Sequence, residues 1–330
     1  MKIAYLGAGA WGYTLANLLA SNGAEVILWD YNGELIRVLE QSRKHPKIDL
    51  EINPNIRLTS NLEEAVSGVD MIVESVTSQG IRPVFGKLAE MNLSCPIVLT
   101  SKGIEQGTGL LLSEVAIEML KDKGRELVTC ISGPSLAAEV SRKMPTSVVC
   151  SSYNEANIPI VVKAFTTDYF RVYPNMDMAG VSFGGAVKNI IAIACGIADG
   201  LGFGDNTKAA LMTRGLHEIR KLGVVKGCKA DTLNGLSGMG DLCVTCLSNL
   251  SRNYKFGHFI AEGLTPQEAK DKVGMVVEGA YTCVSALELG RKHGIPLPIT
   301  EAVYRVLNEG LDPKDAVRQL LTRSVKEEHK

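Results

Sequence analysis

The sequence predicts an α/β fold in which an N-terminal, doubly wound sheet is followed by an all-helical region. Short apolar runs alternate with helical patterns up to about residue 174, which is typical of a parallel sheet covered by helices. A glycine-rich turn follows the first of these runs, and after residue 178 only helical periodicity remains. Since single cores stop growing at roughly 250–300 residues, we expect two domains, residues 1–178 and 179–330.

The first strand, at residues 2–6, ends in the turn GAGAWG at residues 7–12. A helical pattern and a second strand at residues 25–29 follow, and Asp30 stands at the end of that strand. This order of elements is found in dinucleotide-binding folds, where the glycines bring the backbone close to a pyrophosphate at a helix N-terminus. The sequence therefore predicts a dinucleotide cofactor beside Gly7, Gly9 and Gly12.

Asp30 bears on the choice between NAD and NADP. A carboxylate at this place can accept hydrogen bonds from the ribose hydroxyls, and it would repel a 2′-phosphate. We therefore expect NAD to be preferred, with NADP possible. The alternative is that a basic residue close in the sequence compensates for the charge of Asp30. The candidates for that role are Arg37, Arg43 and Lys44.

The remainder of the first domain follows the same alternation. A helix near residues 35–39 is followed by a polar, proline-containing connection through Pro54. Further strands are expected at residues 70–76, 96–100, 127–131, 147–150 and 170–173, with helices at 81–91, 105–120 and 158–165. Ligands of open α/β sheets bind at the carboxyl ends of the strands. Lys102 and the small-residue loop 132–137 follow two of these strands, so both are expected to line a site.

Helical patterns account for the second domain. They cover residues 181–200, 206–222, 230–237, 252–262, 265–273, 279–293, 300–308 and 312–321, and residues 326–330 are expected to form a frayed tail. The first of these helices is apolar on almost every side and is therefore expected to be buried. It carries one ammonium group, Lys188, one turn after Gly184 and Gly185. Lys188 either serves a site or extends its side chain to water.

Three polar clusters interrupt the helical region, at residues 204–208, 238–245 and 249–253. The third places a hydroxyl, a guanidinium and an amide in a row, at Ser251, Arg252 and Asn253. Such a row at a helix N-terminus suits a phosphate. Each cluster on its own could equally be a helix cap or a turn. A domain that holds a dinucleotide needs a substrate beside it, and these clusters are the candidates to bind that substrate.

Composition excludes several classes of function. A net charge of −1 gives no basic field for nucleic acid or an anionic membrane. The longest apolar run, residues 190–198, is far shorter than the ~20 residues that span a bilayer. The eight cysteines are scattered, and the CxxC at residues 243–246 lacks a second ligand pair, so we expect reduced thiols and no metal site. A cytoplasmic protein is expected.

Specific motifs identify a resemblance along nearly the whole chain. They are GAGAWG at 7–12, SKG at 101–103, SGPSLAAEV at 132–140, GGAVKNIIAIACGIADGLGFGDNTKAALMTRGLHEI at 184–219, GMGDLCVTCLSNLSRN at 238–253 and GMVVEG at 274–279. In these motifs the chain resembles the NAD(P)-dependent glycerol-3-phosphate dehydrogenases of bacterial type. The resemblance implies a Rossmann domain, an all-helical domain and a site in the cleft between them. It also implies reduction of dihydroxyacetone phosphate to sn-glycerol 3-phosphate for glycerophospholipid synthesis, and a homodimer.

The resemblance also implies roles for individual residues. Lys188 matches the catalytic lysine, which exchanges a proton with the C2 hydroxyl. The implied substrate contacts are Lys102, Gly133, Ser135, Asp241, Ser251, Arg252 and Asn253. The implied cofactor contacts are Gly7, Gly9, Ala10, Trp11, Gly12, Asp30, Lys102, Ala137, Arg252, Val276 and Glu278. Thr245 and Asn206 match a surrounding polar network.

A lysine can act as a base near neutral pH only if its pKa falls from the reference value of ~10.4. Burial in an apolar helix and the neighbouring charge of Lys102 would lower the pKa of Lys188, whereas Asp241 would raise it. The sequence leaves the net direction of this pKa shift open.

Two positions depart from the family pattern. The family commonly has a basic residue where this chain has Asp30, and it usually has proline at the position of Thr77. The loop beside the cofactor is therefore expected to be set differently. Two other functions stay open: a β-hydroxyacid or 6-phosphogluconate-type dehydrogenase, and a non-catalytic NAD-binding redox sensor.

Overall fold

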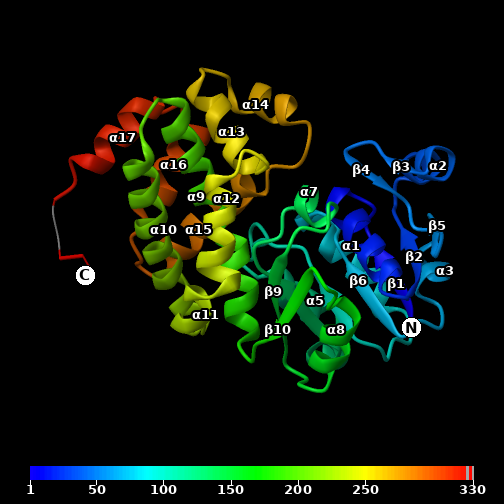
Figure 1. The fold of residues 1–330 in the computed structure, drawn as a ribbon. Coiled ribbons are helices and arrows are strands. Elements are labelled where there is room, and N and C mark those ends of the chain that lie inside the picture. Colours follow the sequence, from blue (N-terminus) through cyan, green and yellow to red (C-terminus); the bar gives the residue numbers. More distant parts are fainter. Residues whose placement is uncertain (325–326, 329–330) are drawn as a thin grey trace.

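The computed structural model describes residues 1–324 and 327–328, so most of the predicted tail at residues 326–330 lies outside the described part. An eight-stranded sheet forms the N-terminal half, and a group of helices forms the C-terminal half (Figure 1). The strand order is β10-β9-β8-β7-β6-β1-β2-β5. The strands are β1 (Lys2–Leu6), β2 (Glu25–Trp29), β5 (Ile56–Thr59), β6 (Met71–Glu74), β7 (Ile97–Leu99), β8 (Val128–Ser132), β9 (Thr146–Ser152) and β10 (Phe170–Pro174). The predicted α/β fold class is confirmed.

Pairing is parallel from β5 through to β8, as the near-continuous apolar runs indicate. The helices of this half are α1 (Ala10–Ser21), α2 (Gly33–Ser42), α3 (Leu62–Val66), α4 (Ile81–Ala89), α5 (Leu112–Leu120), α6 (Gly124–Leu127), α7 (Ala137–Val140) and α8 (Asn157–Phe165). β9 runs antiparallel to β8, and β10 is parallel to β9. The connection from β8 to β9 contains only the four-residue helix α7, so the chain turns back instead of crossing over the sheet.

The structure corrects two parts of the sequence prediction in this half. The segment predicted as a polar connection contains the hairpin β3 (Lys44–His45) and β4 (Ile48–Glu51) and the edge strand β5, and the helix α3 that follows it was not predicted. The helix predicted from residue 105 begins only at Leu112. Residues 105–111 cannot be helical because Gly107 and Gly109 have φ angles of 79° and 69°.

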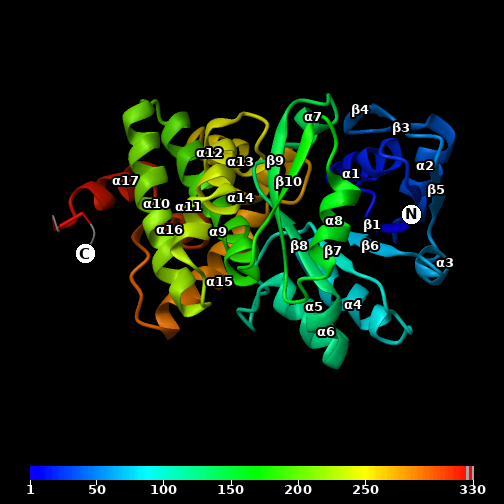
Figure 2. The ribbon, with the colours of Figure 1, turned by 60° about the horizontal axis from the view of Figure 1, so that its bottom comes forward.

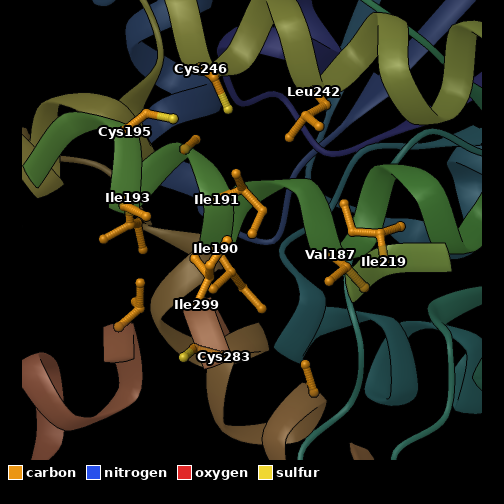
Figure 3. Packing of buried hydrophobic residues seen from close by; sticks show 14 of the residues in the cluster. Val187, Ile190, Ile191, Ile193, Cys195, Ile219, Leu242, Cys246, Cys283 and Ile299 are labelled. Atoms are coloured by element: carbon orange, nitrogen blue, oxygen red, sulfur yellow. The ribbon is translucent and has the colours of Figure 1, made fainter. Parts of the chain in front are cut away.

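The C-terminal half is helical, as predicted. Its long core helix is α9 (Met178–Gly200), which contacts α10 (Asp205–Val225), α11 (Ala230–Asn234), α12 (Asp241–Leu247), α13 (Arg252–Ala261), α15 (Glu278–Lys292) and α16 (Pro298–Asn308). α14 (Pro266–Val273) packs on α13, and α17 (Pro313–Leu321) packs on α16. Figure 3 shows Val187, Ile190 and Ile191 of α9 within the cluster that Ile219 of α10 and Leu242 of α12 complete. Burial on all sides explains why α9 carries no polar face.

α9 is also the only helix among the described residues that is long and apolar enough to cross a membrane, but 94% of its most apolar window is buried inside the protein. It is therefore the core helix of a packed domain. α9 also contacts β8 and β9, so it joins the helices to the sheet (Figure 2). Any side chain at the sheet-facing part of α9 lies where the two halves meet.

Candidate active site

Lys188 lies on α9 at the junction of the two halves and is only 8% exposed. Its Nζ donates hydrogen bonds to Asp241 Oδ1 and, over 2.8 Å, to Thr245 Oγ1. The Thr245 hydroxyl in turn donates to the backbone carbonyl of Asp241, over 2.6 Å. The side chain of Lys188 does not extend into solvent, so the alternative that this lysine only reaches out to water is wrong.

Lys102 reaches the same carboxylate from the opposite half of the molecule. It follows β7, and its Nζ lies 2.6 Å from Asp241 Oδ2 and 3.2 Å from the carbonyl oxygen of Gly133. Asp241 is 1% exposed and therefore joins two ammonium groups inside the protein. One carboxylate between two ammonium groups leaves a net positive charge, which suits an anionic ligand. We call these three residues the Lys–Asp–Lys cluster.

A helical turn and a glycine bring the cluster together. Asp241 begins α12, directly after a π-helical turn, η3 (Leu236–Gly240). π-Helical turns occur frequently at functional sites. On α9, a Cβ at Gly185 would lie 2.6 Å from Ser132 Oγ and 2.9 Å from Lys102 Cδ. The absence of a side chain at Gly185 therefore lets the helix approach the Lys102 side chain. The sequence prediction recognised residues 238–245 as polar but missed α12.

The structure also gives the direction of the pKa shift that the sequence left open. Burial lowers the pKa of Lys188 to about 8, although Asp241 acts in the opposite sense. The charge of Lys102 adds to the lowering. Asp241 only partly offsets burial because burial has the larger effect. Lys188 can therefore exchange a proton close to neutral pH.

The glycine-rich turn has the shape required for a dinucleotide. A Cβ at Gly12 would lie 2.0 Å from the carbonyl oxygen of Gly7, so α1 packs directly onto the turn. A Cβ at Gly9 would meet no atom within 4 Å, and Gly9 precedes α1 without a side-chain cap. The first N–H groups of α1, from Ala10 and Trp11, are therefore available for a pyrophosphate. The residues present fit the expected cofactor.

Asp30 lies beside this turn and is 7% exposed. Its Oδ2 accepts a hydrogen bond from the N–H of Ala8 over 2.7 Å, and its Oδ1 accepts one from Asn32 over 2.9 Å. Asp30 thus holds the turn in place. Each carboxylate oxygen can accept a further hydrogen bond, so a ribose contact remains compatible with these two.

Two of the three basic residues considered as compensation for the charge of Asp30 are already paired with carboxylates. Arg37 lies 2.6 Å from Glu34, and Lys44 lies 3.6 Å from Glu51. Arg43 has no ion pair among residues 1–324 and 327–328, and its backbone is left-handed with a φ of 57°. Only Arg43 is therefore free to meet a 2′-phosphate without breaking an ion pair.

The predicted phosphate row lies at the start of α13. Ser251 Oγ caps this helix by accepting a hydrogen bond from the N–H of Tyr254, and Asn253 Oδ1 accepts one from Gly279 over 2.9 Å. Arg252 is exposed and makes no ion pair or hydrogen bond within the described part of the chain. Ser251 and Asn253 thus position the helix ends, while the guanidinium of Arg252 is free for an anion.

The remaining predicted contacts fall into two groups. Ser135 Oγ donates to the Gly133 carbonyl over 2.9 Å, and Ala137 begins α7 just beyond, so this loop lies beside Lys102. Val276 is 39% exposed, and Glu278 at the start of α15 accepts a 2.6 Å hydrogen bond from Ser78 Oγ across the two halves. Ser78, in the loop after β6, was not singled out from the sequence.

The positions of Asn206 and Asn189 relative to the Lys–Asp–Lys cluster differ from what the sequence motifs indicate. Asn206 is exposed on α10 and has no hydrogen bond to the Lys–Asp–Lys cluster in the described residues. Asn189, directly after Lys188, is 7% exposed, and its side chain has no hydrogen bond within the described residues. It was not predicted, although a buried amide beside a buried lysine is a recognisable signal in an apolar helix.

A glycine-rich turn at a helix N-terminus, facing a helical half that carries a lysine of lowered pKa, defines a dinucleotide-dependent oxidoreductase. Residues 2–158 match the family model described as NAD-dependent glycerol-3-phosphate dehydrogenase N-terminus, and residues 177–318 match that of its C-terminus. The chain belongs to the glycerol-3-phosphate dehydrogenase family. Its enzymes use a nicotinamide dinucleotide.

Individual relatives agree with this assignment. The chain is 56% identical to a glycerol-3-phosphate dehydrogenase (NAD(P)+) of Protochlamydia amoebophila, over 99% of each protein. It is 55% identical to that of Chlamydia muridarum, over 99% of this chain and 98% of the relative. The crystal structure of a glycerol-3-phosphate dehydrogenase from Coxiella burnetii matches with a TM-score of 0.92 and 39% identity, over 98% of this chain and 99% of that one. The other two functions considered from the sequence receive no comparable support.

Proposed function

We propose that this enzyme catalyses reversible hydride transfer between NAD(P)H and dihydroxyacetone phosphate, which yields sn-glycerol 3-phosphate for glycerophospholipid synthesis. The observation that carries the proposal is the Lys–Asp–Lys cluster at the junction of the two halves. The cluster offers a proton-exchanging amine, a second ammonium group and a shared carboxylate within one site. The names of the relatives agree with this activity.

When bound, the cofactor supplies or accepts the hydride at C4 of its nicotinamide. Lys188 performs the accompanying proton transfer. As an ammonium group it donates a proton to the oxygen of the ketone, and as a neutral amine it takes the proton from the C2 hydroxyl. Thr245 and Asp241 orient Nζ through the two hydrogen bonds described above. The positive charge of Lys102 attracts the anionic substrate and helps to lower the pKa of Lys188.

We propose that Arg252 binds the substrate phosphate, with Ser251, Asn253, Lys102, Gly133 and Ser135 around it. Arg252→Ala should raise KM for dihydroxyacetone phosphate about 10- to 100-fold, because a charge-assisted, bidentate contact is lost. The measurement is a steady-state titration of substrate at saturating NADH. Arg214→Ala, an exposed arginine on α10, is the matched control. An unchanged KM in Arg252→Ala would place the phosphate elsewhere, with Lys102 the next candidate.

We also propose that NAD is preferred over NADP because of Asp30, with Gly7, Gly9, Ala10, Trp11, Gly12, Lys102, Ala137, Arg252, Val276 and Glu278 as further cofactor contacts. A carboxylate that faces a 2′-phosphate in a partly desolvated groove should cost about 1–3 kcal/mol, or roughly 5- to 150-fold in affinity. The preference for NAD over NADP should become smaller at high salt, because salt screens the repulsion between Asp30 and the 2′-phosphate.

Asp30→Asn should reduce the preference for NADH, and Asp30→Arg should reverse it. Both are measured as kcat/KM with NADH and NADPH side by side. If Arg43 neutralises the 2′-phosphate instead, the wild type should use both cofactors equally and Asp30→Asn should change nothing. Because Asp30 also holds Ala8, each variant is compared with wild type by its thermal midpoint.

A spectrophotometric assay tests the activity itself. The protein is expected to oxidise NADH with dihydroxyacetone phosphate and to be inactive with β-hydroxyacids or 6-phosphogluconate in the reverse direction. Activity with a hydroxyacid and none with glycerol 3-phosphate would favour the alternative dehydrogenase. Tight NADH binding without turnover on any of these substrates would favour a redox sensor.

We further propose that the protein is a cytoplasmic homodimer. We also propose that each chain is divided into two domains at residue 178. The start of α9 at Met178 supports this division.

A further inference from the structure

A buried carboxyl group lies at the carboxyl end of β6, outside the Lys–Asp–Lys cluster. Glu74 is fully buried, and its side chain accepts hydrogen bonds from two backbone N–H groups: Val76 to Oε2 over 3.1 Å and Ser101 to Oε1 over 3.2 Å. Its own carbonyl oxygen accepts from the N–H of Thr100, over 3.1 Å, and from the Thr100 hydroxyl, over 2.7 Å. Glu74 therefore ties the loop after β6 to the loop after β7.

The protonation of Glu74 follows from the hydrogen bonds of Ser101. The Ser101 hydroxyl lies 2.9 Å from Glu74 Oε2 and 2.5 Å from the carbonyl oxygen of Val76. A hydroxyl has one proton and can donate only one linear hydrogen bond. A carbonyl cannot donate, so both contacts are satisfied when Ser101 donates to Val76 and Glu74 donates to Ser101. That arrangement requires a protonated Glu74. In agreement, burial raises the pKa of Glu74 to about 7.

The two loops that Glu74 joins both lead into the site. Ser101 directly precedes Lys102, whose Nζ pairs with Asp241. Val76 precedes Thr77 and Ser78, and the Ser78 hydroxyl donates to Glu278 in the other half. Thr77 has a φ of −65°, the value that a proline ring would fix, and a ψ of 157°. The backbone at Thr77 is therefore proline-like without a proline ring, and the expected difference in the loop is not seen at this residue.

We propose that Glu74 is a positioning residue. As a neutral carboxylic acid, it fixes the position of Lys102 relative to the loop of residues 75–78. The neutral form is essential to this role, since an ionised carboxylate would compete with Val76 for the single Ser101 proton. Glu74 touches neither the reacting atoms nor the Lys–Asp–Lys cluster directly. Its effect passes through Ser101 to Lys102 and through Val76 to Ser78.

The kinetic test compares Glu74→Gln with Glu74→Ala. Glutamine has the shape of the neutral acid: its amide can donate to the Ser101 hydroxyl and its oxygen can accept from the Ser101 N–H, so only the acceptor for the Val76 N–H is lost. Glu74→Gln should keep kcat/KM within about threefold of wild type. Glu74→Ala leaves buried donors unpaired and should raise KM for dihydroxyacetone phosphate about tenfold or more. A Gln variant as impaired as the Ala variant would overturn the proposal.

Glu218 provides the matched control. It is a buried carboxyl group in the helical half that accepts hydrogen bonds from the N–H groups of Ile299 and Thr300 at the start of α16. Glu218→Ala should lower the thermal midpoint but leave KM unchanged, because its partners do not lead to the site. If Glu74→Ala and Glu218→Ala were to change KM alike, loss of stability alone would explain the effect and the positioning role would be wrong.

An infrared difference spectrum between wild type and Glu74→Gln tests the neutral form without any assay of turnover. At about pH 6, below the pKa of Glu74, the spectrum should show the carbonyl stretch of one protonated carboxyl group. Carboxylate bands in its place would overturn the proposal. The inference rests on the proposed function only for its kinetic part. If wild type failed to reduce dihydroxyacetone phosphate, the proposed function would fail while the infrared result still decided the state of Glu74.

Discussion

Replacing Lys188 by alanine is expected to lower kcat by at least about a hundredfold, because acid–base groups contribute roughly 10²–10⁴-fold to such reactions. No other amine hydrogen-bonds both Asp241 and Thr245 in the described residues, so Lys102, which contacts only Asp241 of this pair, is not held in the position of Lys188. NADH binding should stay within about threefold of wild type, since the expected cofactor site lies mainly on the sheet half. The measurements are single-turnover oxidation of NADH and a fluorescence titration with NADH.

Lys226→Ala is the matched control for this variant. Lys226 is also a largely buried lysine in an ion pair, with Glu114 at 2.7 Å, but it lies away from the Lys–Asp–Lys cluster. It should retain wild-type kcat. More than about a tenth of wild-type activity in Lys188→Ala would rule out Lys188 as the acid–base group.

The second large effect is expected from Asp241→Asn. This change leaves the ammonium groups of Lys188 and Lys102 close together without the carboxylate that joins them. Breaking a buried ion pair in this way typically costs about 3–5 kcal/mol. We therefore expect a lower thermal midpoint and a fall in kcat/KM of about a hundredfold or more. The pKa of Lys188 should also fall further, because Asp241 is the group that opposes the effect of burial.

Glu114→Gln, which removes the carboxylate partner of Lys226, is the control for Asp241→Asn. It should change kcat/KM by less than about threefold, since this ion pair lies away from the Lys–Asp–Lys cluster. A stable Asp241→Asn variant with unchanged kcat/KM would contradict the role that we propose for the Lys–Asp–Lys cluster.

Much of this site could be predicted from the sequence because its components are local. The glycine spacing at residues 7–12 and the acid at the end of the second strand depend only on neighbouring residues. The apolar surroundings of Lys188 could be recognised in the same way, since the helix shows no polar face. Membership of the family, the fold class and the enzyme class are confirmed by the comparisons.

The features that were missed depend on contacts far apart in the chain. Asp241 is shared by Lys102 and Lys188, which lie 139 and 53 residues from it in the sequence. Neither the shared carboxylate nor the balance between burial, which lowers the pKa of Lys188, and Asp241, which raises it, follows from local patterns. Glu74 looks like one polar residue at the end of an apolar strand, and its partner Ser101 belongs to another strand's loop. α12 was missed because its preceding glycines disrupt the helical pattern.

The central claim is that Lys188 carries the proton in both directions of the reaction, and the dependence of kcat/KM on pH, which reports the free enzyme, tests it most directly. With a pKa of about 8, the ammonium form is lost and the neutral amine is formed as the pH rises through that value. Reduction of dihydroxyacetone phosphate should therefore slow above about pH 8, and oxidation of glycerol 3-phosphate should accelerate over the same interval. The claim would be contradicted if the two reactions did not change in opposite directions near this pH. It would also be contradicted if the same pH dependence persisted in Lys188→Ala.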